Sequence, residues 1–250
     1  MMLYKVLAIW VFTVLPLVLP TGDCTQIIGG TEVTPHSLPY MALLHGKYMC
    51  GGMLINSQWV LTAAHCGETT EVFLGVHKRS VSSSSIKVKR NVPHPDYKNV
   101  KGGNDIMLVQ LITSVGQTGK VKVMPLPKPA DDIGGGTKCF VAGWGLNEAN
   151  ILSDVLLSAN VSVIDRKKCN SAEYYNCNPV ITDNMLCAGY DKDPADACQG
   201  DSGGPLVCGG ELRGVVSFGS ECGSKKYPGV YTFISKYDEW IKKTIKNYSV

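Results

Sequence analysis

Ten cysteines in 250 residues constrain this chain more than any other feature of its sequence. So many thiols in a chain of ordinary size indicate an oxidising compartment and a framework of disulfides. A zinc site is a weak alternative, because no Cys-x-x-Cys motif or pair of histidines has the spacing of metal ligands. Apolar residues make up 44% of the chain, so we expect a hydrophobic core in one large domain or two small ones.

The N-terminal residues have the pattern of a secretion signal. Lys5 precedes an apolar run over 6–19, which is too short to span a membrane comfortably. Small residues at Gly22 and Cys24 predict a signal peptide over 1–24, and cleavage after Gly22 is also open. The alternatives are an N-terminal anchor or a buried strand. No other segment is apolar and long enough to cross a bilayer, so we expect no association with a membrane.

The rest of the chain is predicted to be mostly β. Short apolar runs alternate with turn-forming residues, and the helical patterns that parallel α/β folds need between their strands are absent from the sequence. The expected strands cover 38–44, 59–63, 72–76, 106–112, 140–143, 156–164 and 212–218.

The C-terminal segment predicts the clearest helix. Ser235, followed three residues later by Asp238, is typical of a capped helix start. The apolar residues that share one helical face are Tyr237, Trp240, Ile241 and Ile245.

The net charge of +3 is too small to indicate a nucleic-acid partner. The basic residues are unevenly placed, because seven lie within 78–101 against a single acid, Asp96, and three more lie near the C-terminus. A solvated surface explains this pattern about as well as a site for a polyanion does. These basic residues are Lys78, Arg79, Lys87, Lys89, Arg90, Lys98, Lys101, Lys242, Lys243 and Lys246.

Three short strings carry the chemistry, at 61–66 (LTAAHC), 104–108 (NDIML) and 200–205 (GDSGGP). Each has an ordinary explanation alone. A histidine beside a cysteine can be a core residue or a metal ligand, an aspartate before an apolar run is usually a turn or cap, and a glycine-rich string is a plausible turn. Together, in the order His, Asp, Ser, they are the parts of an activated nucleophile.

On these motifs the sequence resembles the chymotrypsin-like, or trypsin-fold, serine proteases, and within them the granzymes of the A and K type. The resemblance runs from Ile27 to the C-terminal helix. It implies an all-β fold of two antiparallel six-stranded β-barrels, with the active site between them and a C-terminal α-helix. The protease domain would span 27–250, with barrels at about 27–130 and 131–234 and the helix at about 235–247.

The resemblance assigns three catalytic residues and needs no cofactor or metal. Ser202 would be the nucleophile, His65 would take its proton and return it to the leaving amine, and Asp105 would hold the other ring nitrogen. The backbone N–H groups of Gly200 and Ser202 would form the oxyanion hole. Non-catalytic relatives lose His or Ser, so the presence of all three residues argues for an enzyme.

By resemblance, Asp196 lies at the base of the primary specificity pocket, and Gly219 and Gly229 leave its walls open. A carboxylate there favours cleavage after Arg or Lys, although Asp196 can also be interpreted as a surface acid. Ala197 stands where relatives often carry a hydroxyl that helps to bind Lys, so we expect Arg to be preferred. The other positions assigned to substrate binding are Gln199, Ser217 and Phe218.

The segment 27–30 (IIGG) resembles the mature N-terminus of the family. In relatives the freed amine of the first residue, here Ile27, pairs with the aspartate before the nucleophile, here Asp201, and the precursor is inactive until it is cut. Gln26 stands before the cut in place of Arg or Lys. This resembles granule proteases, whose short propeptide, here 25–26, is removed by a dipeptidyl peptidase.

The disulfides implied by the resemblance use eight of the ten cysteines. Cys24 and Cys177 remain, and cleavage after Cys24 would leave Cys177 odd. An odd cysteine in a secreted protein indicates an intermolecular bridge or a free thiol, so a monomer and a disulfide-linked dimer both stay open. The implied pairs are Cys50–Cys66, Cys139–Cys208, Cys169–Cys187 and Cys198–Cys222.

The resemblance also implies partners and a cellular setting. Protein substrates, serpin-type inhibitors and sulfated proteoglycan, bound through the basic residues, are the expected partners. We expect a product that is secreted or stored in secretory or cytotoxic granules and acts in immune defence. A digestive or plasma-type protease is the alternative, followed by a heparin-binding non-catalytic relative. Asn247 and Asn160 lie in glycosylation sequons, and Asn160 falls in a predicted strand.

Overall fold

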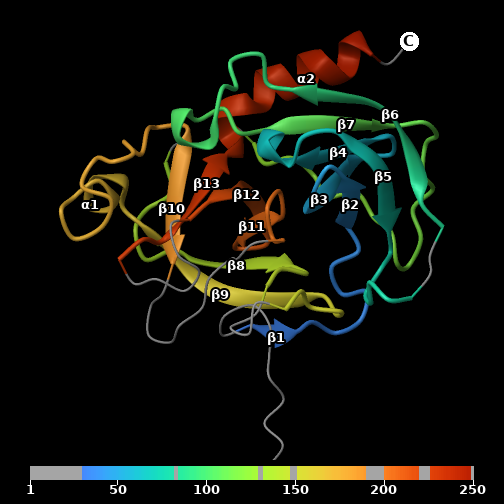
Figure 1. Cartoon of the computed structure of the whole chain (residues 1–250), viewed down its shortest axis with the longest axis horizontal. Helices are drawn as coiled ribbons and strands as arrows, with labels where there is room; N and C mark the ends of the chain where they lie inside the picture. Colours follow the sequence, from blue (N-terminus) through green and yellow to red (C-terminus); the bar gives the residue numbers. More distant parts are fainter. Residues whose placement is uncertain are drawn as a thin grey trace, which may run out of the picture.

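The computed structural model describes residues 30–81, 84–128, 132–146, 151–189, 200–219 and 226–248. These residues form two closed antiparallel β-barrels side by side, with a short helix at the C-terminal end (Figure 1). The predicted all-β fold is therefore confirmed. The signal peptide and propeptide expected at 1–26, together with Ile27, lie outside the described residues.

The first barrel closes from six strands in the order β2-β3-β4-β7-β6-β5. Apolar residues such as Leu44, Met53, Leu61 and Leu108 are fully buried and fill its interior. The strands are β2 (Met41–Gly46), β3 (Met49–Asn56), β4 (Trp59–Thr62), β5 (Thr69–Leu74), β6 (Ile86–Pro93) and β7 (Met107–Leu111).

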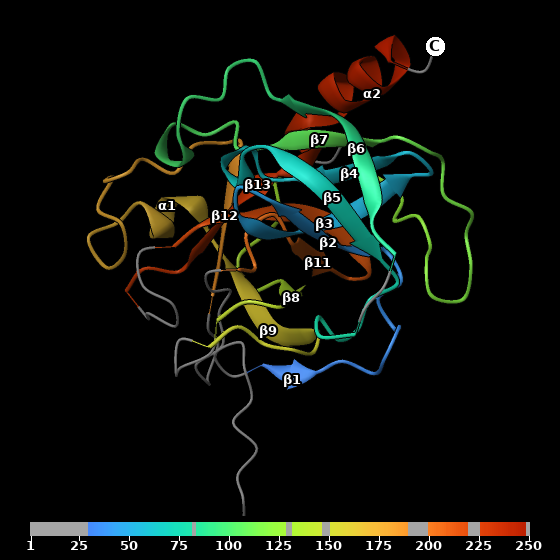
Figure 2. The same cartoon turned by 45° about the vertical axis from the view of Figure 1, so that its right-hand side comes forward.

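The second barrel follows the order β9-β10-β13-β12-β11-β8 and closes because β8 also pairs with β9. A short strand, β1, pairs with the outer side of β9, with Thr31 opposite Ser158 (Figure 2). The segment that precedes the first barrel is thus attached to the second. The strands are β1 (Thr31–Glu32), β8 (Lys138–Gly143), β9 (Leu157–Ile164), β10 (Met185–Gly189), β11 (Pro205–Cys208), β12 (Glu211–Phe218) and β13 (Gly229–Phe233).

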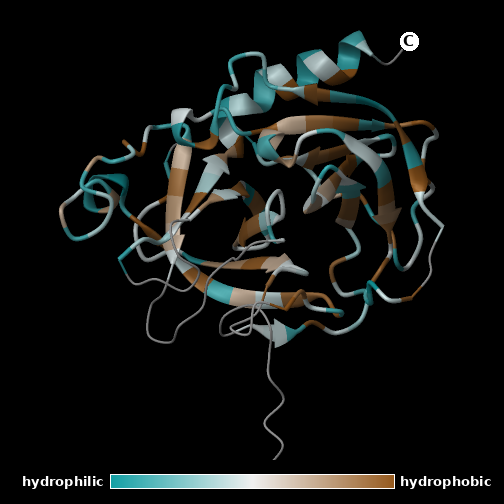
Figure 3. Ribbon diagram, viewed as in Figure 1, coloured by the Kyte–Doolittle hydropathy of each residue, from teal (hydrophilic) through white to brown (hydrophobic). Residues whose placement is uncertain are grey.

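Helices are short and lie outside the barrels. In Figure 3 the barrel strands are largely apolar, whereas the loop around α1 and much of α2 are hydrophilic. None of the helices in the described residues is apolar and long enough to cross a membrane. The helical segments are η1 (Ala64–Cys66), η2 (Val100–Gly102), α1 (Arg166–Cys169), η3 (Ile234–Tyr237) and α2 (Asp238–Asn247).

The C-terminal helix differs from its predicted start. A 3₁₀ turn, η3, continues directly from β13, and α2 begins only at Asp238, three residues later than expected. Ser235 does not cap the helix, since its Oγ is buried with no hydrogen-bond partner among the described residues. The physical reason is packing: Ile234 and Tyr237 are buried against the first barrel, and their burial fixes η3 without a capping side chain.

Candidate active site

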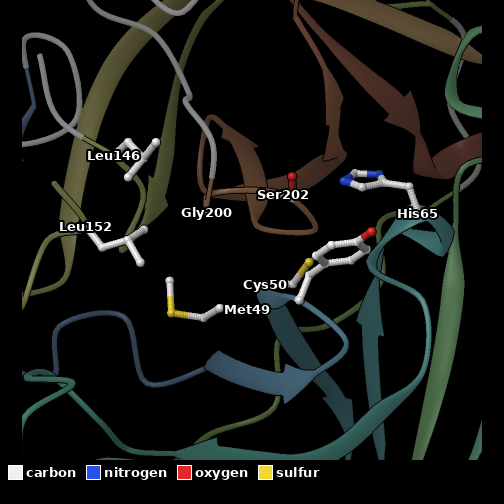
Figure 4. Close-up of a pocket in the computed structure, with 8 residues that line it drawn as sticks. Met49, Cys50, His65, Leu146, Leu152, Gly200 and Ser202 are labelled. Carbon is white, nitrogen blue, oxygen red and sulfur yellow. The ribbon is translucent and has the colours of Figure 1, made fainter. Parts of the chain in front are cut away.

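An open cleft of about 560 Å³ lies where the two barrels meet. Its walls come from the loop between β2 and β3, the start of β3, η1, the connection between β8 and β9, and the turn before β11. Figure 4 shows the imidazole of His65 beside the hydroxyl of Ser202. The lining residues are Tyr48, Met49, Cys50, His65, Leu146, Leu152, Gly200 and Ser202.

His65 is held at the cleft by its neighbours in the chain and by one carboxylate. It lies in η1 directly after β4, and the disulfide Cys50–Cys66 ties the adjacent residue to β3. Its backbone N–H donates to Asp105 Oδ1 at 2.9 Å, and its Nδ1 lies 2.7 Å from Asp105 Oδ2. Two contacts to one carboxylate fix both the position and the orientation of the ring.

Asp105 is the most heavily supported side chain of the site, with only 1% of its surface exposed. Besides the two contacts to His65, its Oδ2 accepts a hydrogen bond from Ser217 Oγ at 2.6 Å. Its backbone oxygen accepts one from Thr232 Oγ1 at 2.7 Å. The first barrel therefore supplies the carboxylate, and β12 and β13 of the second barrel hold it in place. Neither donor was expected to act on Asp105 from the sequence.

This arrangement fixes the chemistry available to the imidazole. An ionised carboxylate only accepts hydrogen bonds, so Nδ1 of His65 must carry the proton. In the neutral ring Nε2 is then an acceptor, able to take a proton from a hydroxyl beside it. The geometry suits a general base next to Ser202.

Ser202 lies in a turn that glycines make possible. Its backbone oxygen accepts from Gly51 N at 2.8 Å, which anchors the turn to β3 of the other barrel. Gly203 has φ +78, and a Cβ there would overlap Thr62 Oγ1. Gly200 has φ +96, and a Cβ there would lie 2.8 Å from Leu152 Cδ2. A side chain at either position would displace the turn that presents the serine.

Asp201 directly precedes Ser202, and its carboxylate lies beside the end of β8. Its carboxylate is buried, with 1% exposure, and Oδ1 accepts from Gly145 N at 2.8 Å. A Cβ on Gly145 or on Gly143 would run into the carboxylate. These glycines leave room for the Asp201 carboxylate, which the family resemblance pairs with the freed amine of Ile27. Ile27, the expected partner, lies outside the described residues.

The residues assigned to the primary pocket are only partly described. Asp196, Ala197 and Gln199 lie outside the described residues. Ser217 and Phe218 end β12, while Gly219 is exposed just beyond it and Gly229 is buried at the start of β13.

The structure contains three of the four expected disulfides: Cys50–Cys66, Cys139–Cys208 and Cys169–Cys187. Cys198–Cys222 and Cys24 lie outside the described residues. Cys177 is a free, exposed thiol between α1 and β10.

Tyr237, which is buried, and Tyr97, which is half-buried, lie near Asp105. Burial raises the pKa of Tyr237 to about 12, and its hydroxyl donates to Asn104 Oδ1 at 3.0 Å. Burial likewise raises the pKa of Tyr97 to about 12. Asn104 has φ +56, a conformation that this hydrogen bond helps to hold. Both hydroxyls therefore stay protonated at neutral pH.

Part of the cleft was not predicted. Tyr48 and Met49 directly precede Cys50, and the expected bridge of Cys50 to the histidine loop was a signal that could have found them. No local pattern marks Leu146 or Leu152, because they approach Ser202 only when the second barrel folds. In the part of the chain that the structure describes, no three His, Cys, Asp or Glu residues are placed to hold a metal ion.

Comparison with known proteins places this geometry in context. A family model described as Trypsin matches residues 27–241. The chain is 44% identical over 239 residues to granzyme A of Bos taurus, with 92% of each chain covered. It is 40% identical to trypsin II-P29 of Gallus gallus, covering 91% of this chain and 92% of the relative. It is 38% identical to kallikrein-4 of Homo sapiens, with 91% of each covered. Each match spans both barrels and the cleft between them.

Proposed function

The chain belongs to the trypsin family of serine proteases and is a trypsin-like serine endopeptidase, and from that premise we propose that it cleaves protein substrates after Arg or Lys with Ser202 as nucleophile. The observation that carries the proposal is the buried Asp105 carboxylate on Nδ1 of His65, in the cleft that Ser202 also lines. A serine hydroxyl is a weak nucleophile and needs such a base beside it.

The reaction proceeds through an acyl-enzyme. Nε2 of His65 takes the Ser202 proton as Oγ bonds to the scissile carbonyl carbon, and the protonated ring gives that proton to the leaving amine as the C–N bond breaks. Water, activated by His65, then hydrolyses the ester. The N–H groups of Gly200 and Ser202 hold the developing oxyanion, and one such donor contributes about 3–4 kcal/mol.

Specificity in this proposal comes from Asp196 at the base of the primary pocket, with Gln199, Ser217 and Phe218 on its approach. Gly219 and Gly229 carry no side chains that would close the pocket to a long cationic residue. Ala197 offers no hydroxyl to a Lys ammonium, whereas an Arg guanidinium still pairs with the carboxylate through two N–H groups. Arg is therefore the preferred residue before the scissile bond.

Activation follows release of Ile27. The freed amine pairs with Asp201, whose carboxylate is already buried beside Gly143 and Gly145. A precursor that keeps residues 25–26 has no amine at this position and stays inactive. The attachment of β1 to β9 supports this route, because it brings the chain just after Ile27 to the same barrel as Asp201.

The wider role proposed here is that of a granzyme-like protease, secreted or stored in cytotoxic granules. Granzyme A among the relatives and Gln26 before the cut favour it over a digestive or plasma-type enzyme. Serpin-type inhibitors and sulfated proteoglycan are the proposed partners, and a disulfide-linked dimer would use the exposed Cys177. Asn160 and Asn247, the proposed glycosylation sites, are both exposed.

The test compares the chain, activated to begin at Ile27, with its Ser202→Ala variant on two peptides that differ only in Arg or Lys before the scissile bond. We expect the parent to cleave the Arg peptide faster and the variant to lose roughly 10⁶-fold in kcat. Equal rates from parent and variant would remove Ser202 as nucleophile. Equal turnover of the two peptides would remove the preference for Arg.

A further inference from the structure

The short strand β1 is held by a side chain of the first barrel. It consists of Thr31 and Glu32, and both are exposed, so apolar burial does not fix it. Glu32 Oε1 lies 2.7 Å from Nε2 of His77, in the loop between β5 and β6. His77 is 7% exposed, whereas half of the Glu32 side chain is exposed. A buried residue of the first barrel therefore anchors a strand that pairs with the second.

The ring of His77 is oriented by this carboxylate. An ionised carboxylate only accepts hydrogen bonds, so Nε2 carries the proton and donates to Glu32. Nδ1 of the same ring is buried and has no partner among the described residues. No second hydrogen bond among those residues competes with the one to Glu32, and that contact sets the orientation of the ring.

The backbone of His77 connects to the residues around Asp201. Its oxygen accepts a hydrogen bond from Trp144 Nε1 at 3.1 Å. Trp144 is fully buried and stands between Gly143 and Gly145 in the chain. These two glycines leave room for the Asp201 carboxylate, and the second of them donates to it. His77 is therefore attached to the segment around Asp201 through its backbone and to the N-terminal segment through its ring.

A second route joins the same segments through backbone hydrogen bonds. Leu156 N donates to His77 O at 2.9 Å, and Val33 N donates to Leu156 O at 3.1 Å. Val33 directly follows β1. Both the backbone and the side chains of the N-terminal segment are thus positioned relative to His77.

The position of Glu32 limits where a freed amine at Ile27 can reach. Ile27 precedes Glu32 by five residues, and five extended residues span at most about 17 Å. A group on a short tether has a higher effective concentration at its binding site than a group on a longer one. Release of Glu32 would lengthen the tether and weaken the pairing of the amine with Asp201.

We propose that His77 is a positioning residue for activation: by holding Glu32, it keeps the N-terminal segment near Asp201 and favours pairing of the Ile27 amine with that carboxylate. The inference rests on the proposed function, since it assumes that this pairing activates the enzyme. A hydrogen bond to a charged group, discounted for the half-exposed carboxylate, corresponds to roughly threefold to tenfold in the equilibrium between paired and free amine.

The experiment measures the free amine in the full chain activated to begin at Ile27. Cyanate carbon bonds to the nitrogen of a free, unprotonated amine and converts it to a neutral urea, which cannot pair with Asp201. The rate at which cyanate abolishes hydrolysis of an Arg p-nitroanilide therefore reports the fraction of free amine. His77→Phe keeps the ring volume and loses the bond to Glu32, so its inactivation near pH 8 should be roughly threefold to tenfold faster than that of the parent.

The pH profile gives an independent readout. Pairing raises the pKa of the amine, and the ion pair is lost as the pH rises through that value, so kcat/KM falls at alkaline pH. A threefold to tenfold weaker pairing should move this fall to lower pH by roughly 0.5 to 1 pH unit. A general structural defect would lower kcat/KM at every pH and leave the alkaline limb in place.

Three further variants locate the effect in this one contact. Glu32→Ala removes the other partner and should reproduce both changes, and it decides the proposal if His77→Phe does not fold. The double variant should show no larger effect than either single one, because the two residues act through one bond. Glu239→Ala removes an exposed carboxylate of α2, at the opposite end of the molecule from β1 (Figure 1), and should behave as the parent.

Each result decides the proposal. A parent rate of inactivation and an unmoved alkaline limb in folded His77→Phe or Glu32→Ala would overturn it, as would effects that multiply in the double variant. Two results on the parent concern the proposed function instead. Activity that resists cyanate even at alkaline pH would remove activation by Ile27 and this inference with it, whereas absence of any hydrolysis that depends on Ser202 would remove the proposed function itself.

Discussion

At the scale of single residues, Gly145 determines where the Asp201 carboxylate lies. Its N–H donates to Asp201 Oδ1 at 2.8 Å, and a Cβ on Gly145 would overlap the carboxylate. Because Ser202 follows Asp201 directly, a shift of the carboxylate is transmitted to the proposed nucleophile. The space left by one absent side chain therefore matters for the active turn.

Gly145→Ala should therefore impair catalysis. Misplacing reacting groups by about 1 Å costs on the order of 100-fold, so we expect a loss of that size in kcat/KM on an Arg peptide. The matched control is Gly116→Ala, where an added Cβ meets nothing within 4 Å. Full activity in folded Gly145→Ala, shown by an unchanged circular dichroism spectrum, would contradict the role given to this glycine.

The residues proposed to carry the chemistry could be identified as candidates from the sequence, whereas Leu146 and Leu152, which line the cleft, could not. His65, Asp105 and Ser202 stand in strings whose residue types have few other uses together. Leu152 looks like any apolar residue of a β protein, since its position beside Gly200 depends on contacts between distant segments. The local sequence around Leu152 does not predict those contacts.

At the scale of elements, the predicted runs correspond to β2, β4, β5, β7, β8, β9 and β12, whereas β3, β6, β10, β11 and β13 were not predicted. The predicted runs at 59–63 and 156–164 correspond to β4 and β9. β3 contains two glycines and a cysteine, and β6 alternates exposed and half-buried residues, four of them basic or polar. β3 pairs with β2, and β6 pairs with β7. These pairings position the two strands, and the hydrophobic pattern of each strand alone does not reveal them.

The turn after β6 packs against α2 through one histidine. The half-buried ring of His94 lies 5.3 Å from that of Tyr237 and 5.0 Å from that of Trp240, and its Nδ1 accepts from Asp96 N at 3.2 Å. Burial lowers the pKa of His94, so the fold favours the neutral ring. Its stabilising contribution is complete above the unfolded pKa of about 6.5 and is lost as the pH falls below it.

His94→Phe should remove this pH dependence. A phenyl ring keeps the aromatic contacts and does not titrate. As the pH falls from 7.5 to 5, the free energy of unfolding of the variant should therefore increase relative to that of the parent. Urea denaturation at both pH values measures the difference. His45→Phe, at an exposed histidine of β2, is the control and should not show the gain. An equal pH dependence in parent and His94→Phe would exclude the proposed effect.

At the scale of the whole molecule, one apolar cluster extends from the first barrel to the outer surface of the second, whose interior forms a cluster of its own. The largest apolar cluster contains Leu54 and Leu108 of the first barrel together with Val207 and Val215 of the second. The same cluster includes Ile241 of α2. The C-terminal helix therefore packs against the first barrel, although it follows the second barrel in the chain. Such continuity predicts that both barrels unfold in one transition.

Ile241→Ala tests this cooperativity. Ile241 is 0% exposed, so the truncation should cost about 2–5 kcal/mol of the free energy of unfolding. Trp59 lies buried in the first barrel, and Trp144 lies buried just after β8 of the second. In a Trp240→Phe background, replacing either with Phe leaves the other as the buried fluorescent reporter. We expect both reporters to unfold at one urea midpoint and Ile241→Ala to lower both midpoints equally. Lys243→Ala, on the exposed face of α2, should leave them unchanged. If Ile241→Ala moved only the Trp59 transition, the barrels would be separate folding units, and the apolar cluster that contains residues of both would not couple their unfolding.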